Sequence, residues 1–237
     1  MQAIIMAAGK GSRLGKLTED KPKSFLEIKG EKLIERNVRM LKQYGINDIV
    51  IVIGYRDQDF VELFKNVPGI RFVYNPYYEF VNVLGSFWLA RKEVSDDFIY
   101  LHADTLCEKS IFEELLSHEG DIVLPVDMKP CDDEAMKVKL NDKAKVIEIT
   151  KQMDCKDAAG EFIGFAKIKK EVIPMLQEKS TELLRNKAYT AYFEAAIQEI
   201  INSNQYDIQV MNTDGRFWAE IDFIEDYERA CKLIPSE

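Results

Sequence analysis

The chain has 237 residues, of which 46% are hydrophobic and 31% charged, enough for one large domain or two small ones with a sizeable core. Asp and Glu (41) outnumber Lys and Arg (32), and the formal net charge of −9 argues against binding to nucleic acid or an anionic membrane, which needs a basic surface. No apolar run approaches the roughly 20 residues that span a bilayer, and no basic residue precedes the N-terminal apolar run as in a signal peptide. The four cysteines lack a CxxC motif, so we expect neither disulfides nor zinc and predict a cytoplasmic location.

Strand-like and helix-like segments alternate through the first half of the chain. Apolar or β-rich runs predict strands at residues 2–8, 48–54, 71–74, 97–103 and 121–126. Helices are expected between them, at residues 31–44, 57–65, 85–93 and 108–118. Strands separated by helices favour an α/β fold, with a mainly parallel twisted sheet flanked by helices.

The second half has a different pattern. Short strands at residues 136–140, 145–150 and 161–168 lie close together, like hairpins, and predict a small β-rich lid. Helices are expected at 170–185 and 188–202, the second with Tyr189 and Tyr192 on an apolar face. Strands at 208–211 and 216–221 and a helix at 224–233 complete the chain. Without a linker, repeat or low-complexity tract, residues 1–237 are predicted to form a single domain.

A glycine loop follows the first strand. Gly9 and Gly11, with Lys10 and Arg13 beside them, would let backbone N–H groups approach a phosphate. The loop is not a Walker motif, and Leu14 stands where the dinucleotide fingerprint has its third glycine, so a bare turn is the alternative. The downstream Lys21-Pro22-Lys23 favours phosphate binding, because two lysines held by a proline could fold back over a triphosphate.

These strings, AIIMAAGKGSRL and then DKPKSFLEIKGEKLIERNVRML, resemble the N-terminal signature of nucleotidyltransferases of the nucleotide-diphospho-sugar transferase type. Further matching segments follow in the family's order, at residues 74–76, 82–90, 102–104, 161–164 and 218–222. The resemblance covers nearly the whole chain. It implies a Rossmann-like nucleotidyltransferase fold, with residues 1–127 as the nucleotide-binding half and 128–237 as the acceptor-binding half. Chain length and the strings DEAMKVKLNDKAKVIEITK and GEFIGFAKI resemble most the small CTP-dependent phosphocholine and 2-aminoethylphosphonate cytidylyltransferases.

The resemblance also implies roles for individual residues. Arg13 would contact the phosphates, and Lys23 the α-phosphate or the acceptor phosphate. The residues expected to bind the nucleotide are Ala7, Ala8, Gly9, Gly11, Ser12, Gly85, Ser86 and Ala103. The residues expected to bind the acceptor are Lys151, Glu161, Tyr189 and Tyr192. For Lys151 the alternative is a solvated surface lysine, and for Gly85 and Ser86 an ordinary helix N-cap.

Nucleotidyl transfer brings two anions together, so the chemistry calls for charge neutralisation and a divalent cofactor, Mg²⁺. Asp104 and Asp222 each follow an apolar strand, at the strand ends where open α/β sheets bind ligands. Glu220 lies two residues before Asp222 on the same strand face and could be a further metal ligand or a bridge to a lysine. His102 shares a face with Asp104, but we interpret it as a satisfied, half-buried histidine.

We therefore predict a Mg²⁺-dependent cytidylyltransferase that transfers CMP from CTP to phosphocholine, 2-aminoethylphosphonate or another small phosphorylated compound. Thr190 and Ala191 stand where a choline enzyme would be expected to carry an acidic residue, which leaves the acceptor open. The alternatives are a sugar-1-phosphate nucleotidyltransferase using UTP, dTTP or GTP, and a non-catalytic nucleotide-binding module. The aromatic and Met-containing surface is compatible with a homodimer, and no nucleic-acid or membrane partner is expected.

Overall fold

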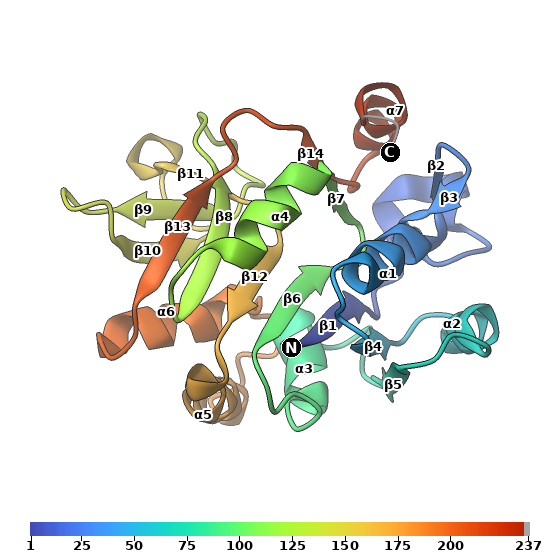
Figure 1. Cartoon of the computed structure of the whole chain (residues 1–237), viewed down its shortest axis with the longest axis horizontal. Helices are drawn as coiled ribbons and strands as arrows, with labels where there is room; N and C mark the ends of the chain where they lie inside the picture. Colours follow the sequence, from blue (N-terminus) through green and yellow to red (C-terminus); the bar gives the residue numbers. More distant parts are fainter. Residues whose placement is uncertain (235–237) are drawn as a thin grey trace.

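A computed structural model describes residues 1–234 as a mixed sheet covered by helices (Figure 1). Ten strands form the main sheet: β1 (Gln2–Ala7), β4 (Asp48–Ile53), β5 (Ile70–Tyr74), β6 (Phe98–His102), β8 (Ile122–Asp127), β9 (Lys137–Leu140), β10 (Val146–Thr150), β11 (Gly160–Phe162), β12 (Phe165–Ile168) and β13 (Ile208–Asn212). Two small ladders join β2 (Glu27–Ile28) to β3 (Glu31–Lys32) and β7 (Thr105–Cys107) to β14 (Trp218–Glu220). The α-helices are α1 (Leu33–Gln43), α2 (Asp57–Phe64), α3 (Val83–Ala90), α4 (Lys109–Ser117), α5 (Ile173–Arg185), α6 (Glu194–Ser203) and α7 (Ile224–Leu233). Short 3₁₀ helices are η1 (Ser12–Thr18), η2 (Lys23–Phe25), η3 (Cys155–Asp157) and η4 (Lys170–Val172).

The first half of the chain, residues 1–127, is built around parallel strands. β1 lies between β4 and β6 and pairs with both in parallel, and β4 pairs in parallel with β5. β12, from the second half, is inserted between β6 and β8 of the first half and is antiparallel to both. These pairings confirm the predicted α/β fold with a sheet that is mostly parallel at its centre.

The β-rich segment of the second half extends this sheet. β11 pairs with β8, β9 with β11, and β10 with β9, all antiparallel, so the order is β10-β9-β11-β8-β12-β6-β1-β4-β5. β13 pairs in parallel with β8 outside that path. The expected lid is therefore the antiparallel end of the main sheet.

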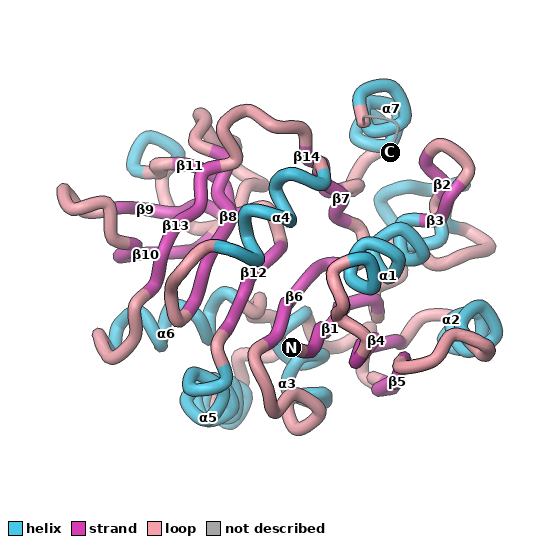
Figure 2. Tube along the Cα trace, in the orientation of Figure 1, coloured by secondary structure: helices cyan, strands magenta, loops and turns pink. Residues whose placement is uncertain are grey.

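Apolar residues cover both faces of the sheet, as expected for buried parallel strands. Along β1, Ile4 and Met6 face one core, to which α3, α5 and α6 contribute. Ala3 and Ile5 face the other core, to which α1, α2 and α4 contribute. Figure 2 shows the helices on the two sides of the strands. Among the described residues, no helix combines the length and the apolar character needed to cross a membrane.

The predicted strand at 161–168 is interrupted at Gly164, which separates β11 from β12. Gly164 has φ +82°, a left-handed conformation that favours glycine, and a Cβ built there would lie 2.9 Å from His102 Nδ1. The break therefore brings the backbone close to the end of β6, and it leaves no room for a side chain beside His102.

The predicted helix at 188–202 is shorter than expected, because α6 begins only at Glu194. Residues 188–193 instead form a loop whose carbonyl groups accept hydrogen bonds from the start of α3: Asn82 N donates to Tyr189 O (2.8 Å) and Leu84 N to Ala191 O (3.3 Å). Tyr189 and Tyr192 are consequently exposed and lie outside the helix, whereas Phe193 alone enters the core.

Candidate active site

A pocket of about 390 Å³ opens where β1 and β6 end, at the edge of the sheet that binds ligands in open α/β folds. It is lined by Met6, Ala7, Ala8, Gly9, Gly11, Ser12, Arg13, Lys23, Ser24, Tyr78, Val81, Asn82, Val83, Ser86, His102, Ala103, Asp104, Lys151, Tyr192, Glu220 and Asp222. Fourteen of these residues were predicted from the sequence to bind the nucleotide, the acceptor or the metal, or to act in catalysis. Segments far apart in the chain therefore converge here. The lining also includes Tyr78 and Asn82, which the sequence analysis did not nominate, although Asn82 opens the quoted segment at 82–90.

The glycine loop packs directly against η2. Gly11 has φ +70°, and a Cβ there would lie only 2.7 Å from the Cβ of Lys23. Thr18 Oγ1 donates a hydrogen bond to Gly11 O (2.8 Å), which closes the loop over η1. Gly11 therefore allows the close approach that brings Lys23 beside the loop.

Lys23 lies between the two predicted metal carboxylates. Its Nζ is 2.6 Å from Asp104 Oδ2 and also forms an ion pair with Asp222. Arg13 Nη2 donates to Asp222 Oδ2 at 2.8 Å. Burial disfavours the charged ammonium, but the charges of Asp104, Asp222 and Glu220 outweigh it and raise the pKa of Lys23. Asp104 and Asp222 meet because Ile221 N donates to Asp104 O (3.1 Å) where β14 leaves β7.

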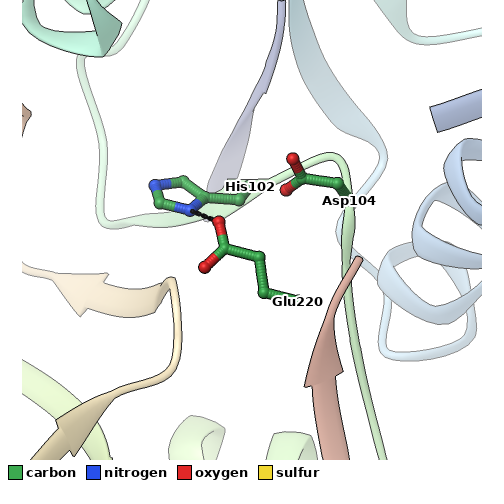
Figure 3. A group of neighbouring side chains, drawn as sticks. All are labelled: His102, Asp104 and Glu220. Atoms are coloured by element: carbon green, nitrogen blue, oxygen red, sulfur yellow. Dashed lines mark hydrogen bonds and ion pairs between the residues drawn. The ribbon is translucent and has the colours of Figure 1, made fainter. Parts of the chain in front are cut away.

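His102 contacts more of the site than the sequence analysis expected. Its Nδ1 lies 3.3 Å from Glu220 Oε1, and its Nε2 lies 2.9 Å from the Tyr100 hydroxyl and 3.9 Å from Glu194 Oε1. Figure 3 shows the ring at the end of β6, pointing to Glu220 from β14, with Asp104 beside it. One ligand atom from each of these three residues lies within 4.8 Å of the others. Their convergence depends on residues more than 100 positions apart, so a local pattern could not reveal it.

The ionisation of His102 is expected to make stability depend on pH. Burial disfavours the charged ring, but the hydrogen bond and charge of Glu220, with the charges of Glu194 and Asp104, raise its pKa from 6.5 to about 9. Because the folded state binds this proton more tightly than the unfolded state, protonated His102 adds to the free energy of unfolding. This contribution is fully present below pH 6.5 and is lost as the pH rises through 9. The shift corresponds to about 3 kcal/mol at about 1.36 kcal/mol per unit.

Urea unfolding of the metal-free wild type and of His102→Gln, at pH 6 and pH 9, measures this contribution. The wild type should lose more stability than the variant over that interval. Because the variant keeps every other titrating group, the difference between the two proteins isolates His102. An equal loss in both would contradict the assignment.

The α3 side of the pocket is set by amide side chains. Asn82, not Gly85 or Ser86, caps α3, because its Oδ1 accepts from Val83 N at 2.8 Å. Ser86 lies one turn into the helix, where its hydroxyl accepts from Asn75 Nδ2 at 2.9 Å. Ser86 faces the pocket, whereas Gly85 lies in a neighbouring apolar pocket that also contains Tyr189.

The acceptor residues are only partly brought together. The ammonium of Lys151 lies 4.9 Å from the centre of the Tyr192 ring, and both line the pocket. Glu134 lies between the two halves, 3.6 Å from Arg13 Nη1 and 4.0 Å from Lys151 Nζ. Glu161 is outside the lining, because Lys129 holds it in a 3.0 Å ion pair. The alternative for Lys151 was a solvated surface lysine, but its side chain is only 26% exposed.

A glycine loop at the end of a parallel strand, with two cations facing clustered carboxylates, defines an α/β enzyme that handles phosphate groups. The MobA-like NTP transferase domain matches residues 3–161, and the chain belongs to this family. This identifies it as a nucleotidyltransferase and confirms the resemblance seen in the sequence.

Full-length relatives point the same way. The chain is 30% identical to the choline-phosphate cytidylyltransferase of Haemophilus influenzae, with 100% of this chain and 99% of the relative covered. It is 29% identical to the CTP:phosphoglutamine cytidylyltransferase of Campylobacter jejuni, over 96% of this chain and 98% of the relative. The solved structure of the CTP:phosphocholine cytidylyltransferase of Streptococcus pneumoniae superposes with a TM-score of 0.81 at 27% identity, covering 96% of each chain.

Proposed function

We propose that this protein is a Mg²⁺-dependent cytidylyltransferase, which transfers CMP from CTP to a small phosphorylated or phosphonylated amine or alcohol and releases pyrophosphate. Phosphocholine and 2-aminoethylphosphonate are the acceptors put forward. The observation that carries the proposal is the convergence of Arg13 and Lys23 with Asp104 and Asp222 beside the glycine loop. Relatives named as choline-phosphate and phosphoglutamine cytidylyltransferases support the choice of CTP.

The residues of the nucleotide half have distinct tasks in this reaction. Backbone N–H groups of residues 9–12, with Arg13, hold the triphosphate, and Lys23 neutralises the phosphate that is transferred. An acceptor oxygen forms a bond to the α-phosphorus, while the bond from that phosphorus to the pyrophosphate oxygen breaks. Because the acceptor oxygen is itself the nucleophile and enters already ionised, no side chain has to act as a general base, and catalysis rests on positioning and charge.

The donor set fits a divalent cation. Asp104 Oδ1 is buried and has no hydrogen-bond partner among the described residues, although its other oxygen binds Lys23. Oxygen donors of this kind are the ligands that Mg²⁺ prefers. Asp104 and Asp222 would hold the ion, with Glu220 as a further carboxylate. When bound, it would neutralise phosphate charge as a Lewis acid.

The acceptor would enter between the two halves. Lys151 is placed to bind its phosphate or phosphonate, and the ring of Tyr192 lies beside that lysine. An aromatic face next to carboxylates also suits a cationic head group. Glu161, Tyr189 and Gly85 would need to move to reach a substrate in this pocket. A cytoplasmic location and a homodimer remain predictions.

Pyrophosphate release with Mg²⁺ tests the proposal. CTP, UTP, GTP, ATP and dTTP would each be combined with phosphocholine, 2-aminoethylphosphonate, phosphoethanolamine, glycerol phosphate and several sugar 1-phosphates. Release only with CTP and a small amine or alcohol acceptor supports the proposal and names the substrate. Release only with a sugar 1-phosphate identifies the alternative sugar-1-phosphate nucleotidyltransferase.

A further inference from the structure

Glu194 is a buried carboxylate to which the proposed reaction gives no task. It is 2% exposed, and neither of its oxygens has a hydrogen-bond partner among the described residues. As the first residue of α6, it lies at the positive end of the helix dipole, which partly offsets the cost of burying the charge. A buried carboxylate without a hydrogen bond still weakens a fold, so its position calls for another explanation.

The carboxylate of Glu194 faces the imidazole of His102 from the protein interior. The distance from Oε1 to His102 Nε2 is 3.9 Å. The surroundings are tightly packed, because Phe193 stacks on Tyr100 with ring centres 3.9 Å apart and Tyr100 lies edge-on to the imidazole. The start of α6 is thereby fixed against the end of β6.

The opposite edge of the imidazole faces the pocket. Nδ1 contacts Glu220 Oε1 at 3.3 Å, which Figure 3 shows as the dashed line. Gly164 packs closely against His102, since its backbone carbonyl accepts from His102 N at 3.1 Å and a Cβ built on it would lie 2.9 Å from Nδ1. His102, whose Nε2 is hydrogen-bonded to the Tyr100 hydroxyl (2.9 Å), thus lies between a carboxylate in the core and one on the pocket wall.

We propose that Glu194 is a positioning residue, which acts through His102 to hold Glu220 in its place on the wall of the pocket. Lys23 bonds to Asp104 and Asp222 but not to Glu220, so His102 is the fixed hydrogen-bond partner of the Glu220 side chain. A glutamate on a pocket wall has several rotamers, and losing this anchor would let it leave the site. The inference rests on the proposed function, in which Glu220 contributes to the reacting centre.

A double-mutant cycle tests whether Glu194 acts through Glu220. Glu194→Gln keeps the side-chain shape and is expected to lower kcat/KM for CMP transfer about tenfold, as for other residues that orient a ligand of the reacting centre. The double variant Glu194→Gln/Glu220→Gln should be no slower than Glu220→Gln alone. Fully additive losses would overturn the proposal. Glu199→Gln is the matched control, because Glu199 lies on α6 without an ion pair or side-chain hydrogen bond among the described residues.

Stability separates positioning from a structural role. Glu194→Gln replaces a buried carboxylate that has no hydrogen-bond partner among the described residues, and only a 3.9 Å ion-pair contact with His102, by a neutral side chain of the same shape, so its unfolding temperature should stay close to that of the wild type. A fall in unfolding temperature in step with activity would overturn the proposal. If Glu194→Gln fails to fold, His102→Gln can replace it in the cycle, because it removes the residue through which Glu194 acts. His102→Gln should lower kcat/KM in the wild-type background but cause no further loss in the Glu220→Gln background.

Imidazole NMR provides a readout that needs no turnover. The chain has two histidines, so His118 serves as an internal reference for His102. Both Glu194→Gln and Glu220→Gln should move the ring ¹H–¹⁵N signals of His102 and leave those of His118 in place. Unchanged His102 signals in Glu194→Gln would overturn the inference. A wild type that transfers no CMP would count against the proposed function instead, because the His102 signals test the contacts directly.

Discussion

Asp222→Asn is expected to lower kcat for CMP transfer by about 100- to 1,000-fold, the range seen when one preorganised charge or donor is removed from a reacting centre. Asp222 pairs with both Arg13 and Lys23, and in the proposed function it also holds the divalent ion. The free energy of unfolding should change by only about 1 kcal/mol, because Lys23 keeps Asp104 and Arg13 keeps Glu134 as partners.

Steady-state pyrophosphate release and urea unfolding, measured on the same preparations, check this result. Asp214→Asn is the matched control: Asp214 has φ +52°, which asparagine tolerates, and it lies in the loop before β14, outside the pocket lining. Near-normal turnover of Asp222→Asn would remove Asp222 from the metal site.

Lys23→Met is expected to abolish turnover and to change how the fold responds to Mg²⁺. Without the ammonium, Asp104 loses its ion pair and Asp222 keeps only Arg13, which should cost the metal-free protein about 3–5 kcal/mol. A divalent ion can replace the missing charge between them. Mg²⁺ should therefore stabilise the variant more than the wild type, in which it has to displace Lys23.

Thermal unfolding in EDTA and across a Mg²⁺ series, for both proteins, measures this difference. Lys16→Met, which removes an exposed lysine of η1 outside the pocket lining, should match the wild type in both activity and Mg²⁺ response. An equal Mg²⁺ increment in the wild type and Lys23→Met would mean that the ion binds elsewhere.

The elements that the sequence predicts best are those whose burial is visible locally. β1 and β6 are apolar runs buried along nearly their whole length, and the shared carboxyl edge of parallel strands predicted the glycine loop and Asp104 on the same side of the sheet. Asp222 was predicted at the same edge because it also follows an apolar strand. It does line the pocket, but it comes from the end of β14, which pairs with β7 outside the main sheet.

The parts that escaped prediction depend on partners distant in the chain. β7 is three residues long and exists because β14 pairs with it, which no local periodicity encodes. The sequence of residues 188–193 resembles that of a helix, but carbonyl groups of this segment accept hydrogen bonds from the start of α3 instead. Glu161 was assigned to the acceptor without knowledge that Lys129 would hold it. His102 was interpreted as a satisfied, half-buried histidine, because the sequence does not show that Glu194 and Glu220 both lie beside it.

The unbroken pairing from β5 to β10 limits how this enzyme can move during a reaction cycle. Backbone hydrogen bonds cross the boundary between the two halves at β6, β12 and β8, so the halves cannot swing apart about a hinge without breaking the sheet. Opening and closing of the pocket would then depend on the segments beside it. These are the glycine loop and the segments that carry Glu134 and Tyr192. Such segments open at a lower free-energy cost than sheet strands, and their reopening can limit product release.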